Sequence, residues 1–250
     1  LDVTVTYSED VICNGGDDGF IDLEVSGGCN PYTYIWSNGE TSQDISDLLA
    51  GTYSAIVTDS NGCFFEINDV DIVQSSEIII ESLDSSILTL NCFGDDNGLI
   101  NISVNGGVGD YSYEWSNGEI SQNISNLSAG IYSVTVTDSN DCSNSLEFEV
   151  VQPDDIDIFA DITSLACGSS DGSIDLTVFG GSGDYTYDWS NGETTEDIFG
   201  LDAGIYSVTI LDSNGCGSDT SFEVIGSDNS VVIEVNSIQN SSCFSFSFND

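Results

Sequence analysis

The sequence contains no lysine, arginine, histidine or methionine in 250 residues, and only two prolines. Its 44 aspartates and glutamates are therefore unbalanced and give a formal net charge of −44 at pH 7. Without a cationic side chain the protein has no direct cationic contact to offer a phosphate, so we expect no nucleic acid partner. An anionic membrane surface would repel it for the same reason.

The missing histidine and lysine also bear on catalysis, because general acid–base chemistry is left to carboxylates alone. Carboxylates do occur as adjacent pairs, such as Asp17-Asp18 and Asp95-Asp96. Neighbouring residues on a strand point apart, however, whereas a glycosidase needs two carboxylates that converge across a cleft. We therefore expect the protein not to be an enzyme.

Long hydrophobic runs are absent as well. Stretches such as Ile78-Ile79-Ile80 are too short to span a bilayer, so we expect no membrane insertion.

A high net charge is typical of disordered chains. This chain is nevertheless 39% hydrophobic and 10% aromatic, and its apolar residues alternate with polar ones. It can therefore bury a core. With no basic segment before an apolar run, we expect a mature product or an internal piece.

The sequence repeats itself three times. Trp36, Trp115 and Trp189 each end a Tyr-x-Tyr-x-Trp segment and precede Ser-Asn-Gly-Glu, with Ala-Gly-x-Tyr-Ser further on. The tryptophans lie 79 residues apart (36 to 115) and then 74 apart (115 to 189). Such periodicity is typical of a tandem array of small domains. We predict domains at 1–74, 75–152 and 153–226, and the start of an incomplete fourth repeat at 227–250.

Each repeat has the pattern of short strands. In the second, Ile100, Ile102 and Val104 alternate with polar residues. Turn signals recur about every ten residues and no helical period occurs, which predicts an all-β fold of tandem immunoglobulin-like β-sandwich domains arranged end to end. The Asn-Gly pairs predict two-residue hairpins. We assign six aromatic residues to the cores, the last three as tyrosine corners: Trp36, Trp115, Trp189, Tyr53, Tyr132 and Tyr206.

Six of the eight cysteines follow the repeat. Cys13 and Cys63 are 50 residues apart, as are Cys92 and Cys142, while Cys167 and Cys216 are 49 apart. This spacing predicts one disulfide within each repeat and an oxidising, extracellular setting. A metal site is disfavoured because the chain has no histidine and no Cys-x-x-Cys. Cys29 and Cys243 fall outside the pattern and are predicted to be unpaired or intermolecular.

Calcium is the one ligand for which the sequence offers candidates, and no other cofactor is expected. Hard cations prefer carboxylate and carbonyl oxygens. Candidate residues lie in recurring acidic turns: Asp17, Asp18, Asp59, Asp95, Asp96, Asp138, Asp171 and Asp212. A second set flanks the linkers: Asp69, Asp71, Glu77, Asp154, Asp155 and Asp157. The alternative is that aspartate occupies turns because it caps them, and that surface acid keeps the chain soluble.

Three motifs in fixed order resemble the SprB repeat, found in very large surface proteins of gliding and other Bacteroidetes. They are Cys-x-Gly-x-x-Asp-Gly, then Tyr-x-Tyr-x-Trp-Ser-Asn-Gly-Glu, then Leu-x-Ala-Gly-x-Tyr. The resemblance covers roughly residues 10–65, 89–144 and 164–218. The extra Cys29, Asn140-Asp141 in place of Asn-Gly, and the segments at Cys167 and Cys243 depart from it. It implies type IX secretion and display on the outer surface, associated with the outer membrane.

Three functions remain open. The first is a load-bearing, disulfide-stapled stalk of a large adhesin that attaches to extracellular surfaces or polysaccharide and contacts its own neighbouring repeats. The second is an array of carbohydrate-binding modules, in which the Tyr-x-Tyr-x-Trp strands would stack on sugars, although a core role is the simpler interpretation. The third is a self-assembling filament subunit that uses Cys29 and Cys243 between molecules.

Overall fold

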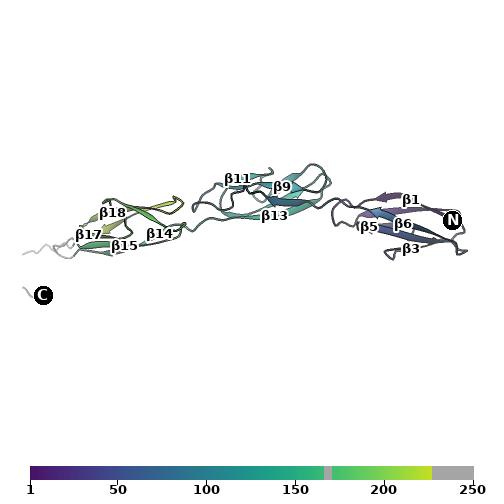
Figure 1. The fold of residues 1–250 in the computed structure, drawn as a ribbon, viewed down its shortest axis with the longest axis horizontal. Coiled ribbons are helices and arrows are strands. Elements are labelled where there is room, and N and C mark those ends of the chain that lie inside the picture. The colour runs from purple at the N-terminus through teal and green to yellow at the C-terminus, as the bar shows by residue number, and fades with distance from the viewer. Residues whose placement is uncertain (166–170, 227–250) are drawn as a thin grey trace, which may run out of the picture. The chain divides into compact units, whose positions relative to one another are not determined.

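The computed structural model describes residues 1–165 and 171–226, and within them all regular secondary structure is β-strand (Figure 1). The predicted incomplete fourth repeat at 227–250, together with Cys167 and Cys243, lies outside the described residues. The chain divides into two compact units, Leu1–Pro153 and Asp154–Asp250. The described residues include no helix long and apolar enough to cross a membrane.

The first sandwich contains two three-stranded antiparallel sheets, β1-β2-β4 and β3-β5-β6. Alternation explains the packing: in β2, Ile21 and Leu23 are buried while Glu24 between two inward positions is exposed. Together with Trp36 and Val57, these residues form one apolar core between the sheets. The strands are β1 (Asp2–Glu9), β2 (Gly19–Ser26), β3 (Thr33–Trp36), β4 (Ile45–Leu48), β5 (Gly51–Thr58) and β6 (Phe64–Ile72).

The second sandwich belongs to the same unit and has its own core around Trp115. One sheet, β10-β12-β13, matches its counterpart, but the other is divided into the pairs β7-β9 and β11-β8. The division falls at Asn101, whose backbone N–H donates to Ser86 Oγ at 3.0 Å rather than to a strand. The strands are β7 (Ile79–Ser82), β8 (Gly98–Ile100), β9 (Ile102–Asn105), β10 (Ser112–Trp115), β11 (Ile124–Leu127), β12 (Gly130–Thr137) and β13 (Ser143–Val150).

The third sandwich, in the second unit, repeats the topology of the first, with sheets β14-β15-β17 and β16-β18-β19 around Trp189. Its strands are β14 (Asp157–Thr163), β15 (Gly172–Phe179), β16 (Thr186–Trp189), β17 (Ile198–Leu201), β18 (Gly204–Leu211) and β19 (Gly217–Val224). The predicted all-β, immunoglobulin-like class is confirmed.

The predicted Asn-Gly hairpins are wrong. A type I′ turn needs positive φ at both central residues, but only Gly39, Gly118 and Gly192 have it, with φ near 90° (92°, 88° and 89°). In addition, the strand after this turn does not pair with the strand before it: β3 pairs with β5, whereas β4 pairs with β2. The turn therefore carries the chain from one sheet to the other.

Candidate functional site

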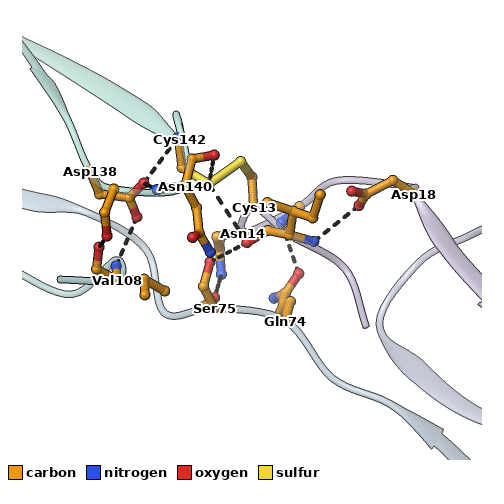
Figure 2. Close-up of a disulfide and its surroundings, with 12 residues drawn as sticks. Cys13, Asn14, Asp18, Gln74, Ser75, Val108, Asp138, Asn140 and Cys142 are labelled. Carbon is orange, nitrogen blue, oxygen red and sulfur yellow. Dashed lines mark hydrogen bonds between the residues drawn. A yellow bond between two sulfur atoms is a disulfide. The ribbon is translucent and has the colours of Figure 1, made fainter. Parts of the chain in front are cut away.

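A disulfide joins the first and second sandwiches. Cys13, in the loop between β1 and β2, is bonded to Cys142, in the turn between β12 and β13 (Figure 2). Their Cα atoms lie 5.4 Å apart, although the residues are 129 apart in sequence. The predicted pairs within repeats, Cys13–Cys63 and Cys92–Cys142, are therefore wrong.

The strand arrangement explains why the within-repeat pair cannot form. The loop that holds Cys13 lies beside the end of β6, since Val11 N–H donates to Val73 O at 2.9 Å. Cys63 directly precedes the start of β6, a strand of nine residues. The two cysteines thus lie at opposite ends of a strand about 30 Å long, whereas a disulfide requires Cα atoms within about 7 Å.

The remaining cysteines fall into three groups. Cys29 and Cys63 are free and exposed, so Cys29 is unpaired in the described part of the chain and the assignment of Cys63 to a disulfide is wrong. Cys92 and Cys216 are both disulfide-bonded. Cys167, like Cys243, lies outside the described residues.

The linker after β6 is held by the loop that carries Cys13 (Figure 2). Gln74 Oε1 accepts the N–H of Gly15 at 2.8 Å. Ser75 takes part in two hydrogen bonds: its Oγ donates to Ile12 O at 3.0 Å, and its carbonyl accepts Asn14 Nδ2 at 3.2 Å. Three loop residues on either side of Cys13 are thus hydrogen-bonded to two linker residues next to the disulfide.

The same linker is bound to the second sandwich. Gly107 N–H donates to Ser76 O at 2.9 Å, and Asn144 Nδ2 donates to Ile78 O at 2.7 Å. Cys13 packs against the edge of the second core, and a small cleft between it and Ile78 is lined by residues of both sandwiches. The junction therefore combines a covalent bond with a hydrogen-bonded linker.

A buried aspartate builds the turn that presents Cys142. Asp138 is only 5% exposed, and its Oδ2 accepts the N–H of Val108 at 2.8 Å. Its Oδ1 accepts the N–H groups of Asn140 and Cys142 at 2.9 and 3.0 Å. Burial alone would raise the pKa of this carboxyl, but the three backbone donors outweigh burial and hold the pKa below its ordinary value.

Asp59 and Asp212 form the same turn in the other two sandwiches. Each is buried, each accepts backbone N–H groups with both carboxylate oxygens, and the pKa of each is likewise lowered by those donors against the effect of burial. These three carboxylates therefore cap turns, as the alternative to calcium binding requires.

The other calcium candidates do not converge. Asp18 accepts Ile12 N–H at 3.1 Å and Asp95 accepts Cys92 N–H at 3.1 Å, so both cap their own loops. The structure leaves Asp17, Asp96 and Asp171 exposed. Among the described residues, no group of three or more acidic, cysteine or histidine side chains could hold a metal ion. The geometry thus gives the calcium hypothesis no support.

The structure places the repeated aromatic residues in the cores. Trp36, Trp115 and Trp189 are each 2% exposed, and each indole Nε1–H donates to a backbone carbonyl at 2.8–3.0 Å. A sugar-stacking face would need an exposed indole. The hydroxyls of Tyr53, Tyr132 and Tyr206 donate to the carbonyls of Leu49, Ser128 and Asp202, four residues upstream in each case, as in a tyrosine corner.

Solved structures with tandem β-domains resemble the chain only distantly. The three N-terminal domains of the bacteriophage RB49 outer capsid protein Hoc are 15% identical, with 89% of this chain and 94% of that chain covered and a TM-score of 0.37. The I67–I69 fragment of titin is 10% identical, with coverage of 90% and 99% and a TM-score of 0.36. Among curated proteins, none matches this sequence.

The family comparison addresses the repeats themselves. The family model of the SprB repeat matches residues 5–41, 90–119 and 160–194. Each match falls in a different sandwich and includes the buried tryptophan of that sandwich. The predicted resemblance is therefore confirmed, because the SprB-repeat model matches a region in each of the three sandwiches.

Proposed function

We propose that this chain is a segment of a large extracellular repeat adhesin or surface filament of a gliding-type bacterium, in which it acts as a load-bearing stalk. The SprB-repeat match in each of the three sandwiches and a disulfide between consecutive sandwiches support this proposal. Disulfides persist in oxidising compartments, which fits secretion, by the type IX route that the family resemblance implies, and display on the cell surface.

The disulfide between sandwiches is the observation that carries the mechanical role. When the chain is pulled at its ends, Cys13 and Cys142 cannot separate, because their bond fixes their Cα atoms 5.4 Å apart. The residues between them form a closed loop that the force cannot extend, even if both sandwiches unfold. A separation of 129 residues corresponds to about 450 Å of extended chain that the bond withholds.

The surface chemistry fits a stalk better than a specific receptor. The net charge of −44 keeps neighbouring molecules apart and the chain in solution. The tryptophans needed for a sugar-binding array are buried. Attachment to extracellular surfaces or polysaccharide would then rely on many weak contacts along a repeated chain rather than on one strong site.

Single-molecule force spectroscopy tests the mechanical role. Two chains are pulled from end to end, one with Cys13 and Cys142 intact and one with Cys13→Ser and Cys142→Ser. Both carry Cys92→Ser and Cys216→Ser, because disulfides at those residues would also reduce the measured extension. We expect the chain with the intact bond to extend by about 450 Å less on complete unfolding.

A chain that carries Cys63→Ser in the intact background is the matched control, and its extension should not change. Equal extensions for the chains with and without the Cys13–Cys142 bond would contradict the load-bearing role. Added reductant should convert the first chain into the second, which ties the difference to the disulfide rather than to the serine substitutions.

A further inference from the structure

The turn that presents Cys63 duplicates the turn that presents Cys142. In each, a buried aspartate accepts the N–H of the cysteine four residues on and donates its own N–H to the carbonyl of that cysteine at 2.9 Å. The serine that follows the aspartate donates through its N–H and its hydroxyl to one carbonyl of a neighbouring loop. The equivalent residues are Asp59 and Asp138, Ser60 and Ser139, Asn61 and Asn140, and Cys29 and Val108.

The two cysteines nevertheless differ in state. Cys142 is 7% exposed and bonded to a loop of the preceding sandwich. Cys63 is an exposed free thiol on the same backbone frame. Cys216, on the third copy of the turn, is also disulfide-bonded. Both other members of this position therefore hold a disulfide, which indicates that the frame is built to receive one.

We propose that Cys63 forms a disulfide with another SprB repeat, placed directly before Leu1 in the same polypeptide. The bonding cysteine would lie in the loop of that repeat that corresponds to the loop carrying Cys13. The loop would have the pattern Cys-x-Gly of Cys13-Asn14-Gly15 and Cys92-Phe93-Gly94. This inference rests on the equivalence of the turns and goes beyond the proposed stalk function, because it assigns a docking surface and its occupant.

The start of the first sandwich shows where the linker of such a repeat would run. Leu1 contacts the site of Gly28 as Ile78 contacts that of Gly107, and β1 begins with the pair Asp2↔Ser26 as β7 begins with Ile79↔Asn105. Residues directly before Leu1 would thus take the place of Ser75–Glu77.

The linker favours a preceding repeat of the same polypeptide, rather than a second molecule of this chain, as the partner of Cys63. At the observed junction, Gln74 and Ser75 form hydrogen bonds with the loop that carries Cys13. Ser76 forms a hydrogen bond with the second sandwich, which carries Cys142. A continuous chain holds both sets of bonds together, and so raises the effective concentration of the two thiols. A separate copy would bring the loop without the connection.

Cys29 does not compete for the bond. Asn61 Nδ2 donates to Cys29 Sγ at 3.0 Å, and in the third sandwich Asn214 Nδ2 donates to Ser182 Oγ at 2.8 Å. Cys29 thus stands where a serine hydroxyl accepts the same hydrogen bond. The thiol acts there as a polar acceptor within the turn, and we expect it to stay reduced.

Formation of the bond needs a disulfide oxidant, for which oxidised glutathione serves in the test. The Cys63 thiolate attacks one sulfur of the oxidant and releases one glutathione thiolate, leaving a mixed disulfide. The thiolate of the incoming loop then attacks the Cys63 sulfur and releases the second glutathione. Two protein thiols lose two protons and are oxidised to one disulfide, while one oxidant molecule is reduced to two thiols.

The test uses the full chain with a further repeat fused before Leu1. Residues 1–77 placed there reproduce the spacing of the observed junction, because Leu1 takes the position of Ile78. After folding in a glutathione buffer, unreacted thiols are alkylated and the bonds are mapped by mass spectrometry. A protease that cleaves at aspartate and glutamate is used, since the chain has no lysine or arginine for trypsin.

We expect a bond between Cys13 of the added copy and Cys63 of the original chain, with loss of Cys63 alkylation. Cys13→Ser in the added copy should restore that alkylation. A second fusion, with residues 78–155 before Leu1, brings Cys92 as the donor and is expected to bond to Cys63 as well. The original Cys13–Cys142 bond reports correct folding within each molecule.

Three results would overturn the proposal. One is a Cys63 that remains alkylated in both fusions while Cys13–Cys142 forms. Another is a Cys29–Cys63 bond. The last is a disulfide-linked dimer of the unfused chain through Cys63 under the same buffer, which would make a second copy the occupant. The force measurement is independent, since it concerns only the bond already present.

Discussion

The turn at Cys63 and the turn at Cys142 have the same hydrogen bonds but different surroundings. Asp59 and Asp138 are both buried and both organise their turn through backbone N–H groups. Only at Cys142 does a neighbouring loop complete the site with a disulfide. The comparison teaches that local sequence builds the cysteine-bearing turn, whereas the neighbouring repeat decides whether that cysteine is bonded.

The largest expected effect comes from removing each cysteine in turn. Cys142→Ser breaks the bond across a 129-residue separation, and the chain-entropy account gives a loss of up to about 5 kcal/mol. Cys63→Ser removes an exposed thiol and should change stability by no more than about 0.5 kcal/mol. Scanning calorimetry of both full-length variants, with and without reductant, measures the difference.

Equal destabilisation by Cys142→Ser and Cys63→Ser would mean that the two turns are equivalent in solution and that the comparison fails. Reductant supplies the internal check: it should lower the stability of the parent chain and of the Cys63→Ser variant together. Any other disulfide in the chain contributes equally to all three proteins, so it cancels from the comparison.

A smaller effect should separate the glycines that lie beside the start of β7 and the start of β1. Gly106 has φ +83°, and a Cβ there would lie 1.8 Å from Glu77 O. Gly27, at the same position of the first sandwich, has φ +65°, and its Cβ would lie 3.5 Å from Leu1 N. Left-handed backbone strain costs either alanine about 1–2 kcal/mol. In the 250-residue chain, Gly106→Ala should lose more stability, because the Glu77 carbonyl has to move.

Urea unfolding of Gly106→Ala and Gly27→Ala against the parent chain checks this. A larger loss for Gly27→Ala than for Gly106→Ala would show that the linker carbonyl can move freely, and that the junction is looser than its hydrogen bonds indicate.

The cores were predictable from the sequence because their determinants are local. Alternation in β2 and β12 and the Tyr-x-Tyr-x-Trp strand specify which residues face inward, and the buried Trp36 and Trp115 follow from them. The tyrosine corner is equally local, since Tyr53 contacts a carbonyl only four residues upstream.

Disulfide pairing was not predictable, because a periodic array makes several registers look alike. Cys13 stands 50 residues before Cys63 and one repeat further from Cys142, so the fixed spacing fits both pairings. The deciding fact is that Cys13 lies at the far end of β6 from Cys63. It depends on the contact of Val11 with Val73, which joins distant segments and has no signature in the sequence.

The Asn-Gly turns failed for a related reason. The pair predicts a tight turn, and a turn is present at Gly39. Which strand continues after it depends on the pairing of β4 with β2 across the sandwich, and so on the whole core. Local chemistry gave the bend, while non-local packing gave its direction.

The smallest expected effect is a pH dependence that the two turns should share. Backbone donors hold the pKa values of Asp59 and Asp138 below the ordinary value, against the effect of burial. A lowered folded-state pKa means that the carboxylate stabilises the fold above the unfolded-state pKa, about 3.9, and that this contribution is lost as the pH falls through the folded-state pKa. Asp59→Asn and Asp138→Asn should therefore be less stable than the parent at pH 7, and the deficit should shrink below about pH 4.

Asp96→Asn controls for the loss of one negative charge, because Asp96 is exposed. Urea midpoints between pH 7 and pH 3 give the difference in stability between each variant and the parent. This difference cancels the relief of charge repulsion that is common to all the chains.

If the disulfide at Cys142 holds its turn in place of the aspartate, the stability deficit of Asp138→Asn will be smaller than that of Asp59→Asn. Equal deficits that vanish together on acidification would establish that the aspartate frame works alike with and without a bonded neighbour. A deficit that grows on acidification would show that the carboxylates cap these turns in their protonated form, contrary to the geometry.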